Sequence, residues 1–164
     1  MARYSGGARA SGAGSSTLPS GSIYAVANRA PCVREVGWFN TTATATAHFL
    51  TRLTTAGTQG ANITEDPDDV ESAAVTATVV NTHSSTGPTL GNDMGYRAPI
   101  GAAIGAGVIF TFGDRGKRIP QGTGNGVGII TVSGVTAQIV DFTSNMPSRM
   151  RCVACPWSSA PIVS

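Results

Sequence analysis

The sequence predicts an all-β fold, a single jelly-roll-like antiparallel β-sandwich, from its composition, the spacing of its turns and its length. Only 12% of the residues are charged and 6% are aromatic, while glycine alone supplies 21. A chain rich in glycine, alanine, threonine, serine and valine favours strands and turns over helices. The apolar runs suggest about seven or eight short strands with turn signals about every 8 to 12 residues, which is typical of sandwiches and jelly rolls. The length of 164 residues fits one domain.

The clearest strand pair is Val33–Leu50, VREVGWFNTTATATAHFL, which predicts a hairpin with its bend at residues 40–42. In the second strand, alanines and Phe49 alternate with threonines and His48, and this period of two places the threonines and His48 on a wet face. The first strand has apolar residues on both faces, as in strands that are covered on both sides. The two faces carry Val36 with Trp38, and Val33 with Phe39. We expect Trp38 to pack in the core rather than to stack on a sugar.

Further strands are expected along the chain, each an apolar run bounded by glycine, proline or a polar turn. The segments are 22–29, 73–82, 96–100, 107–112, 128–132 and 136–142. Glycines between the third and fourth of these segments permit a bend. The last two segments predict a closing hairpin through residues 133–135.

Both ends of the chain predict extended segments outside the domain. Residues 1–21 are a tract of glycine, alanine and serine with few large side chains. Such a composition cannot bury a core, so we expect an N-terminal arm that is disordered in isolation. Residues 147–164 contain three prolines and no sustained strand period, which predicts an irregular C-terminal tail. The expected β-sandwich domain is therefore residues 22–146.

Charge and hydropathy argue against two classes of partner. The net charge is only +2, and the basic residues are scattered without aromatic residues between them, so we expect no nucleic-acid partner. No apolar run reaches the roughly 18 residues that cross a bilayer, and the first residues lack the apolar core of a secretory signal, so we expect no membrane partner. Three cysteines without a disulfide-dense pattern agree with a reducing cytoplasm.

Cys152 and Cys155 form a CxxC motif that leaves three interpretations open: unreactive thiols, half of a zinc site, or a disulfide. A structural zinc site needs four ligands, and the other candidates, Cys32, His48 and His83, are isolated in the sequence. A redox CxxC begins a helix after a strand, whereas this pair precedes a proline in the expected tail. The pattern therefore favours unreactive thiols.

Three other patterns resemble functional sites but have simpler explanations. The acidic segment 65–71, EDPDDVE, could hold calcium, but it lacks the ligand order of an EF-hand and suits a solvated or partner-facing loop. The segment 122–128, GTGNGVG, lacks the Lys-Ser/Thr of a phosphate-binding loop and suits a β-turn. His48 or His83 could serve a hydrolase, but no GxSxG motif accompanies them. We therefore expect no enzyme, with no catalytic residue, no cofactor and no metal site.

Several segments resemble a family of small structural proteins from the virions of tailed bacteriophages. They are VREVGWFNTTATA (33–45), RLTTAGTQGA (52–61), EDPDD (65–69), NTHSSTGPTLG (81–91), GYRAPIGAAIGAGVIFTFGDRGKRIP (95–120) and TGNGVGI (123–129). Together they cover most of residues 22–142, while the arm and the tail depart from the family pattern. The resemblance implies a β-sandwich particle protein on the head surface or among minor tail components.

This resemblance suggests a capsid decoration, or cement, protein that binds the outer surface of the major capsid lattice and stabilises the head. Its expected partners are the major capsid protein and further copies of itself, as a homotrimer. It would be made in the host cytoplasm and located on the virion head. The N-terminal arm would contact the capsid through Arg3, Tyr4 and Arg9. The alternative is a minor tail or fibre component, with host binding as one role.

Overall fold

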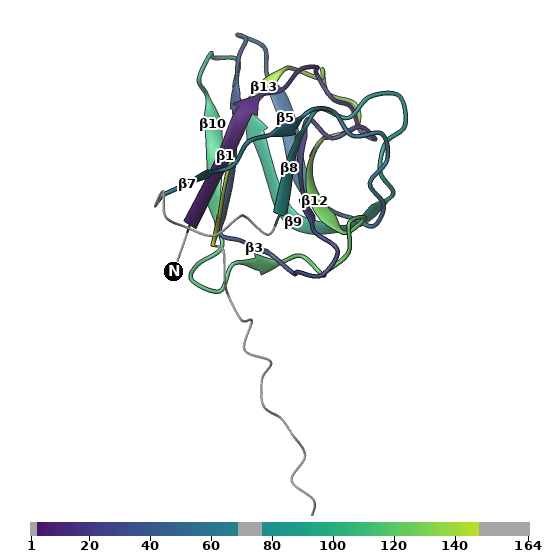
Figure 1. Ribbon diagram of the computed structural model, residues 1–164. Helices are drawn as coiled ribbons and strands as arrows, with labels where there is room; N and C mark the ends of the chain where they lie inside the picture. Colours follow the sequence, from purple (N-terminus) through teal and green to yellow (C-terminus); the bar gives the residue numbers. More distant parts are fainter. Residues whose placement is uncertain (1–2, 69–76, 148–164) are drawn as a thin grey trace, which may run out of the picture.

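The computed structural model describes residues 3–68 and 77–147, and within them the chain is all-β (Figure 1). No helix occurs in this part of the chain. Two antiparallel sheets pack face to face as a β-sandwich, and a two-stranded ribbon of β3 and β11 lies beside them. The all-β sandwich predicted from the sequence is confirmed.

One sheet, sheet A, has five strands in the order β10-β4-β13-β1-β7. Its strands are β1 Arg3–Arg9, β4 Glu35–Asn40, β7 Asp66–Pro67, β10 Gly107–Thr111 and β13 Val140–Pro147. The other sheet, sheet B, has six strands in the order β6-β8-β2-β12-β5-β9. Its strands are β2 Gly21–Ala25, β5 Thr46–Leu53, β6 Asn62–Ile63, β8 Ala77–Asn81, β9 Leu90–Ile100 and β12 Gly126–Thr131. The ribbon pairs β3 Cys32–Val33 with β11 Lys117–Arg118.

The strands of both predicted hairpins are present, but the two strands of each hairpin do not pair with each other. The two strands of Val33–Leu50 separate, because β4 pairs with β13 and β10 in sheet A while β5 pairs with β12 and β9 in sheet B. The expected closing hairpin separates in the same way, with β12 in sheet B and β13 in sheet A. Each connecting loop carries the chain across the roughly 10 Å between facing sheets, so that both strands turn an apolar face to one core.

Within the N-terminal arm expected over residues 1–21, residues 3–9 are instead a strand of the sandwich. Arg3–Arg9 form β1, an internal strand of sheet A that pairs with β13 over its whole length and with β7 on its other side. Its inward face is made of small residues and Tyr4, and a Cβ on Gly6 would already lie 3.2 Å from the Val79 side chain. The glycines let this strand pack closely against sheet B, which explains why its composition resembles a flexible tract.

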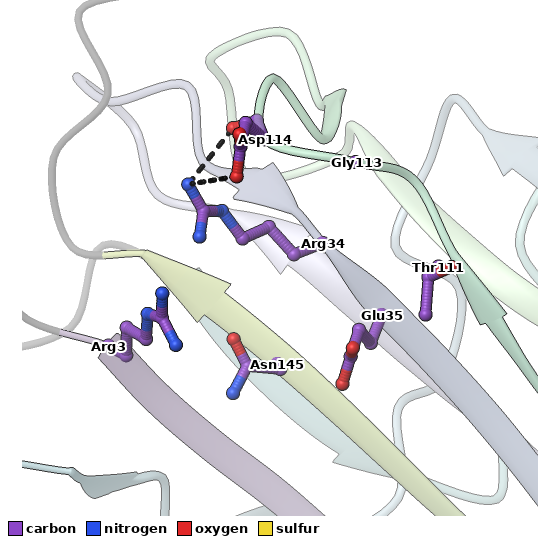
Figure 2. Close-up of a pocket in the computed structure, with 7 residues that line it drawn as sticks. All are labelled: Arg3, Arg34, Glu35, Thr111, Gly113, Asp114 and Asn145. Carbon is purple, nitrogen blue, oxygen red and sulfur yellow. Dashed lines mark hydrogen bonds and ion pairs between the residues drawn. The ribbon is translucent and has the colours of Figure 1, made fainter.

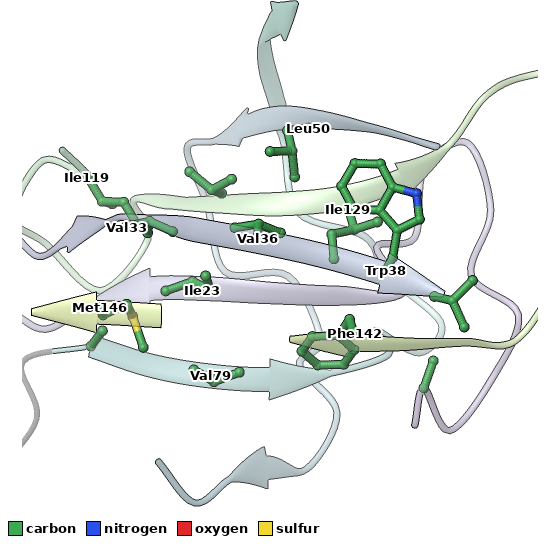
Figure 3. Close-up of a cluster of buried hydrophobic side chains, with 14 of the residues drawn as sticks. Ile23, Val33, Val36, Trp38, Leu50, Val79, Ile119, Ile129, Phe142 and Met146 are labelled. Atoms are coloured by element: carbon green, nitrogen blue, oxygen red, sulfur yellow. The ribbon is translucent and has the colours of Figure 1, made fainter. Parts of the chain in front are cut away.

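The core lies between the two sheets and includes Trp38, which is fully buried, as predicted (Figure 3). The same cluster contains aliphatic side chains from both sheets, together with Phe142 and Met146 of β13. On β5 the alternation is as predicted but the face is reversed. Thr46 and His48 point inward and are buried, while Phe49 is only half-buried on the other face. The reversal follows from Leu50, which shares the inward face and packs in the core.

Candidate functional site

The predicted capsid-contact residues do not form one surface. Tyr4 points into the core with an exposed fraction of only 2%. Arg3 and Arg9 point outward from sheet A, but they occupy opposite ends of β1, about 20 Å apart for six strand residues. The capsid contact predicted for Tyr4 is therefore wrong, because the alternation of a strand sends Tyr4 to the opposite face from Arg3 and Arg9. The contacts predicted for Arg3 and Arg9 stay predictions.

Arg9 is held by Asp141 on the neighbouring strand β13. The Arg9 Nε donates to Asp141 Oδ1 at 2.9 Å and the second contact, Nη2 to Oδ2, is 3.1 Å. The hydrogen bond from Arg9 lowers the pKa of the Asp141 carboxyl. Both side chains are well exposed, so the pair adds little to stability.

A polar pocket of about 260 Å³ opens at the other end of sheet A (Figure 2). It is lined by Arg3, Arg34, Glu35, Thr111, Gly113, Asp114 and Asn145. The Arg34 guanidinium donates to the backbone oxygen of Asp114 at 3.0 Å, and the same nitrogen lies 3.7 Å from its carboxylate. Two arginines face two carboxylates here, so the pocket suits a small polar group and carries no strong net charge.

The same region is the charged end of the molecule. Besides the pocket residues, the loop before β11 and β11 itself bring Arg115, Lys117 and Arg118. The Lys117 ammonium lies over the Tyr96 ring, 5.0 Å from its centroid. In Figure 1 this end, with β3 and the start of β1, is at the bottom.

The opposite end carries no charged residue in three loops that follow one another around it: 41–45, 101–106 and 132–139. We call these loops the uncharged end. They are tied together by hydrogen bonds, because the Thr41 hydroxyl donates to the Ile139 carbonyl at 2.7 Å and the Asn40 amide donates to the carbonyls of Thr44 and Gly101 at 3.0 Å each. The loops therefore form one connected surface.

Large apolar side chains stand out from this uncharged end. Ile104 is 73% exposed, and Val135 and Ile139 are 38% and 36% exposed. They make up three of the four exposed large apolar residues in the described part of the chain, and the fourth is Ile109 on β10. Sequence reasoning missed this surface, although the absence of charged residues from segments 41–45, 101–106 and 132–139 can be seen in the sequence.

Both histidines are buried. His83 Nε2 lies 2.9 Å from the Ser22 hydroxyl, a serine–histidine contact that the sequence did not reveal. Both residues are 2% exposed, and His83 Nδ1 has no hydrogen-bond partner in the described residues, so no carboxylate orients this ring. His48 is fully buried, which contradicts its expected place on a wet face. Its Nδ1 lies 3.4 Å from the Thr131 hydroxyl.

The remaining sequence motifs have structural roles where the structure describes them. The Glu65 carboxylate accepts the backbone N–H of Val79 at 2.6 Å, and Asp66–Pro67 form β7, so the start of the acidic segment belongs to the sheet edges. The glycine-rich segment 122–128 is a turn that leads into the buried strand β12. Residues 3–68 and 77–147 contain no cluster of three potential metal ligands. Cys152 and Cys155 lie outside the described residues.

Comparison with protein-family models, with curated proteins and with solved structures finds no match to this chain. Residues 3–68 and 77–147 contain no helix that could span a bilayer.

Proposed function

We propose that this chain is a bacteriophage capsid decoration protein, which binds the outer surface of the major capsid lattice and stabilises the head. The observation that carries the proposal is the uncharged end, with Ile104, Val135 and Ile139 exposed among small residues. The segment resemblance to small virion proteins supports the same class of function. In this proposal the main capsid contact is made by the uncharged end rather than by Arg3, Tyr4 and Arg9.

The chemistry of the uncharged end suits a broad protein surface. Burying a charged side chain costs several kcal/mol unless it is paired, and these three loops contain none. Alanine, glycine and threonine allow close approach to a flat partner, and the three exposed aliphatic side chains supply apolar area. Repetition over a symmetric lattice then turns weak single contacts into a stabilising shell.

We also propose that the sandwich is a jelly roll. The strands β1, β13, β4 and β10 are neighbours in sheet A, and β2, β12, β5 and β9 are neighbours in sheet B in the matching order. The links β1 to β2, β4 to β5, β9 to β10 and β12 to β13 all cross between the sheets, as in a rolled-up pair of Greek keys. Viral capsid proteins commonly use this architecture, although fold alone does not fix function.

The test is binding of the purified chain to heads that lack it. The double variant Ile104→Asp/Val135→Asp places two charges on the uncharged end, and we expect it to bind about tenfold more weakly or worse. Gln121→Asp, an exposed position near the start of β12, is the matched control and should bind like the original chain. Unchanged binding of the double variant would remove the observation on which the proposal rests.

The polar pocket at the charged end favours a second candidate, a minor tail or fibre component that binds a polar group on the host. The two candidates differ in location and copy number, because decoration needs a copy at each equivalent lattice position whereas a tail part needs few. Quantitative mass spectrometry of particles, with antibody labelling of heads and tails, separates them.

A further inference from the structure

The four sheet edges are not equally protected against pairing with another chain. An exposed edge strand is a template for intermolecular pairing, and proteins shield such edges with short strands, proline, charge or bulges. Here β6 and β7 are only two residues long. The long edge strand β9 contains Pro99, carries the Asp93–Arg97 ion pair and shows two register irregularities against β5.

The edge strand β10 has none of these features. Its sequence, GVIFT over Gly107–Thr111, contains no charge and no proline, and it pairs with β4 in five regular positions. Ile109, at its centre, points outward from sheet A and is 52% exposed. In the single chain, no strand pairs with the outer edge of β10. Nothing in the sequence of β10 would prevent a strand of another chain from pairing there.

The hydrogen bonds beside β10 show which of its backbone groups face the open edge. Asn40 N donates to Ala106 O, and Phe112 N donates to Arg34 O, both at 2.7 Å. In an antiparallel pair the residues that bond to a given neighbour alternate. The even-numbered residues of β10 thus bond to β4, so Gly107, Ile109 and Thr111 direct their N–H and C=O groups to the open edge.

We propose that β10 pairs antiparallel with β10 of a second copy, about a twofold axis at Ile109. The two A sheets would then form one continuous ten-stranded sheet. Ile109 faces its equivalent, Gly107 faces Thr111, and about six new backbone hydrogen bonds form across the axis. No like charges oppose each other, because β10 has none.

A second copy is the occupant that these observations favour. A twofold pair needs only one unprotected edge, whereas a ring such as a trimer needs two different complementary edges. Among the four edge strands, only β10 is longer than two residues, regular in its pairing and free of charge and proline. This inference goes beyond the proposed function, and it gives a dimer where the family resemblance implied a homotrimer.

The first test is the oligomeric state of the full chain, measured by sedimentation at micromolar concentration without capsids. We expect a dimer, and Ile109→Lys should raise its dissociation constant at least about tenfold, because two ammonium groups then face each other. Ile104→Lys, which is more exposed but lies outside β10, is the matched control and should remain dimeric. A monomer or a trimer, or a dimer insensitive to Ile109→Lys, would overturn the proposal.

The second test reads the register directly. In a background with Cys152→Ser and Cys155→Ser, Ile109→Cys places two thiols opposite each other at about 5.5 Å between Cα atoms, within disulfide range. Mild oxidation should therefore yield a covalent dimer. Thr111→Cys, two residues along on the same face, faces Gly107 and should not crosslink. Equal crosslinking of the two variants, or crosslinking of neither, would exclude the proposed register. Because no capsid is present, these outcomes are independent of the decoration role.

Discussion

His48 is a titratable group held neutral inside the sandwich. It lies edge-on to Trp38, with ring centroids 6.1 Å apart, and near the hydroxyls of Thr46 and Thr131. Burial lowers the pKa of His48 to about 4. An unfolded histidine has a pKa of about 6.5, so between these values the unfolded chain binds a proton that the folded chain does not.

The folded state should therefore lose stability as the pH falls from about 6.5 toward 4, with no contribution from His48 above that range. Between pH 7.5 and pH 4.5 we expect a loss of about 2 kcal/mol from this residue. Urea unfolding of the original chain and of His48→Gln at both pH values measures it. The glutamine variant should lose less stability on acidification, and an equal loss in both proteins would contradict a buried neutral His48.

At the scale of elements, the strands could be predicted locally but their partners could not. Val33–Leu50 contains two strands, as the alternation indicates, yet β4 and β5 belong to different sheets. The strand β1 was missed because its two glycines, Gly6 and Gly7, hide the period of two and resemble a flexible tract. What makes β1 a strand is the pairing with β13, some 130 residues later in the chain, as in Arg9 with Asp141 at a separation of 132.

The place of β1 in the sandwich can be tested through Tyr4. Tyr4→Ala should destabilise the fold by about 3 to 5 kcal/mol, because it empties a large buried site. Tyr4→Phe should be close to neutral, since the Tyr4 hydroxyl is buried without a hydrogen-bond partner among the described residues. Arg3→Ala, on the exposed face of the same strand, is the control and should change stability by about 0.5 kcal/mol or less. Thermal and urea unfolding give these values, and an external arm would instead leave Tyr4→Ala as stable as Arg3→Ala.

At the scale of the whole molecule, the sandwich has two chemically different ends. The loops 41–45, 101–106 and 132–139 are uncharged, while the pocket and the loop into β11 gather arginines, a lysine and carboxylates. Because the strands run between the two ends, the charged and uncharged loops lie at opposite ends of the sheets. Attachment through the uncharged end would leave the charged end facing solvent.

This orientation predicts salt-insensitive attachment to heads. Raising NaCl from 0.1 to 1 M shortens the screening length from about 10 to about 3 Å, which weakens contacts between exposed charges but not apolar ones. We expect the number of copies on each head to stay constant across this range, measured by pelleting heads and quantifying the bound chain. Release at 1 M NaCl would instead indicate attachment through exposed charges, such as those of the charged end or of the Arg9–Asp141 pair.

The sequence by itself determined the β class, most strand positions and the burial of Trp38, because alternation and turn residues act over a few neighbouring positions. It also contained the charge-free turns of the uncharged end. Only the tertiary structure decided which strands pair, which face of β5 is inside, and that Tyr4 belongs to the core while Arg3 and Arg9 lie far apart on the surface. The physical reason is that a period of two defines two faces of a strand but does not show which face is buried. The neighbouring strands and the opposite sheet determine the buried face, and they come from distant parts of the chain.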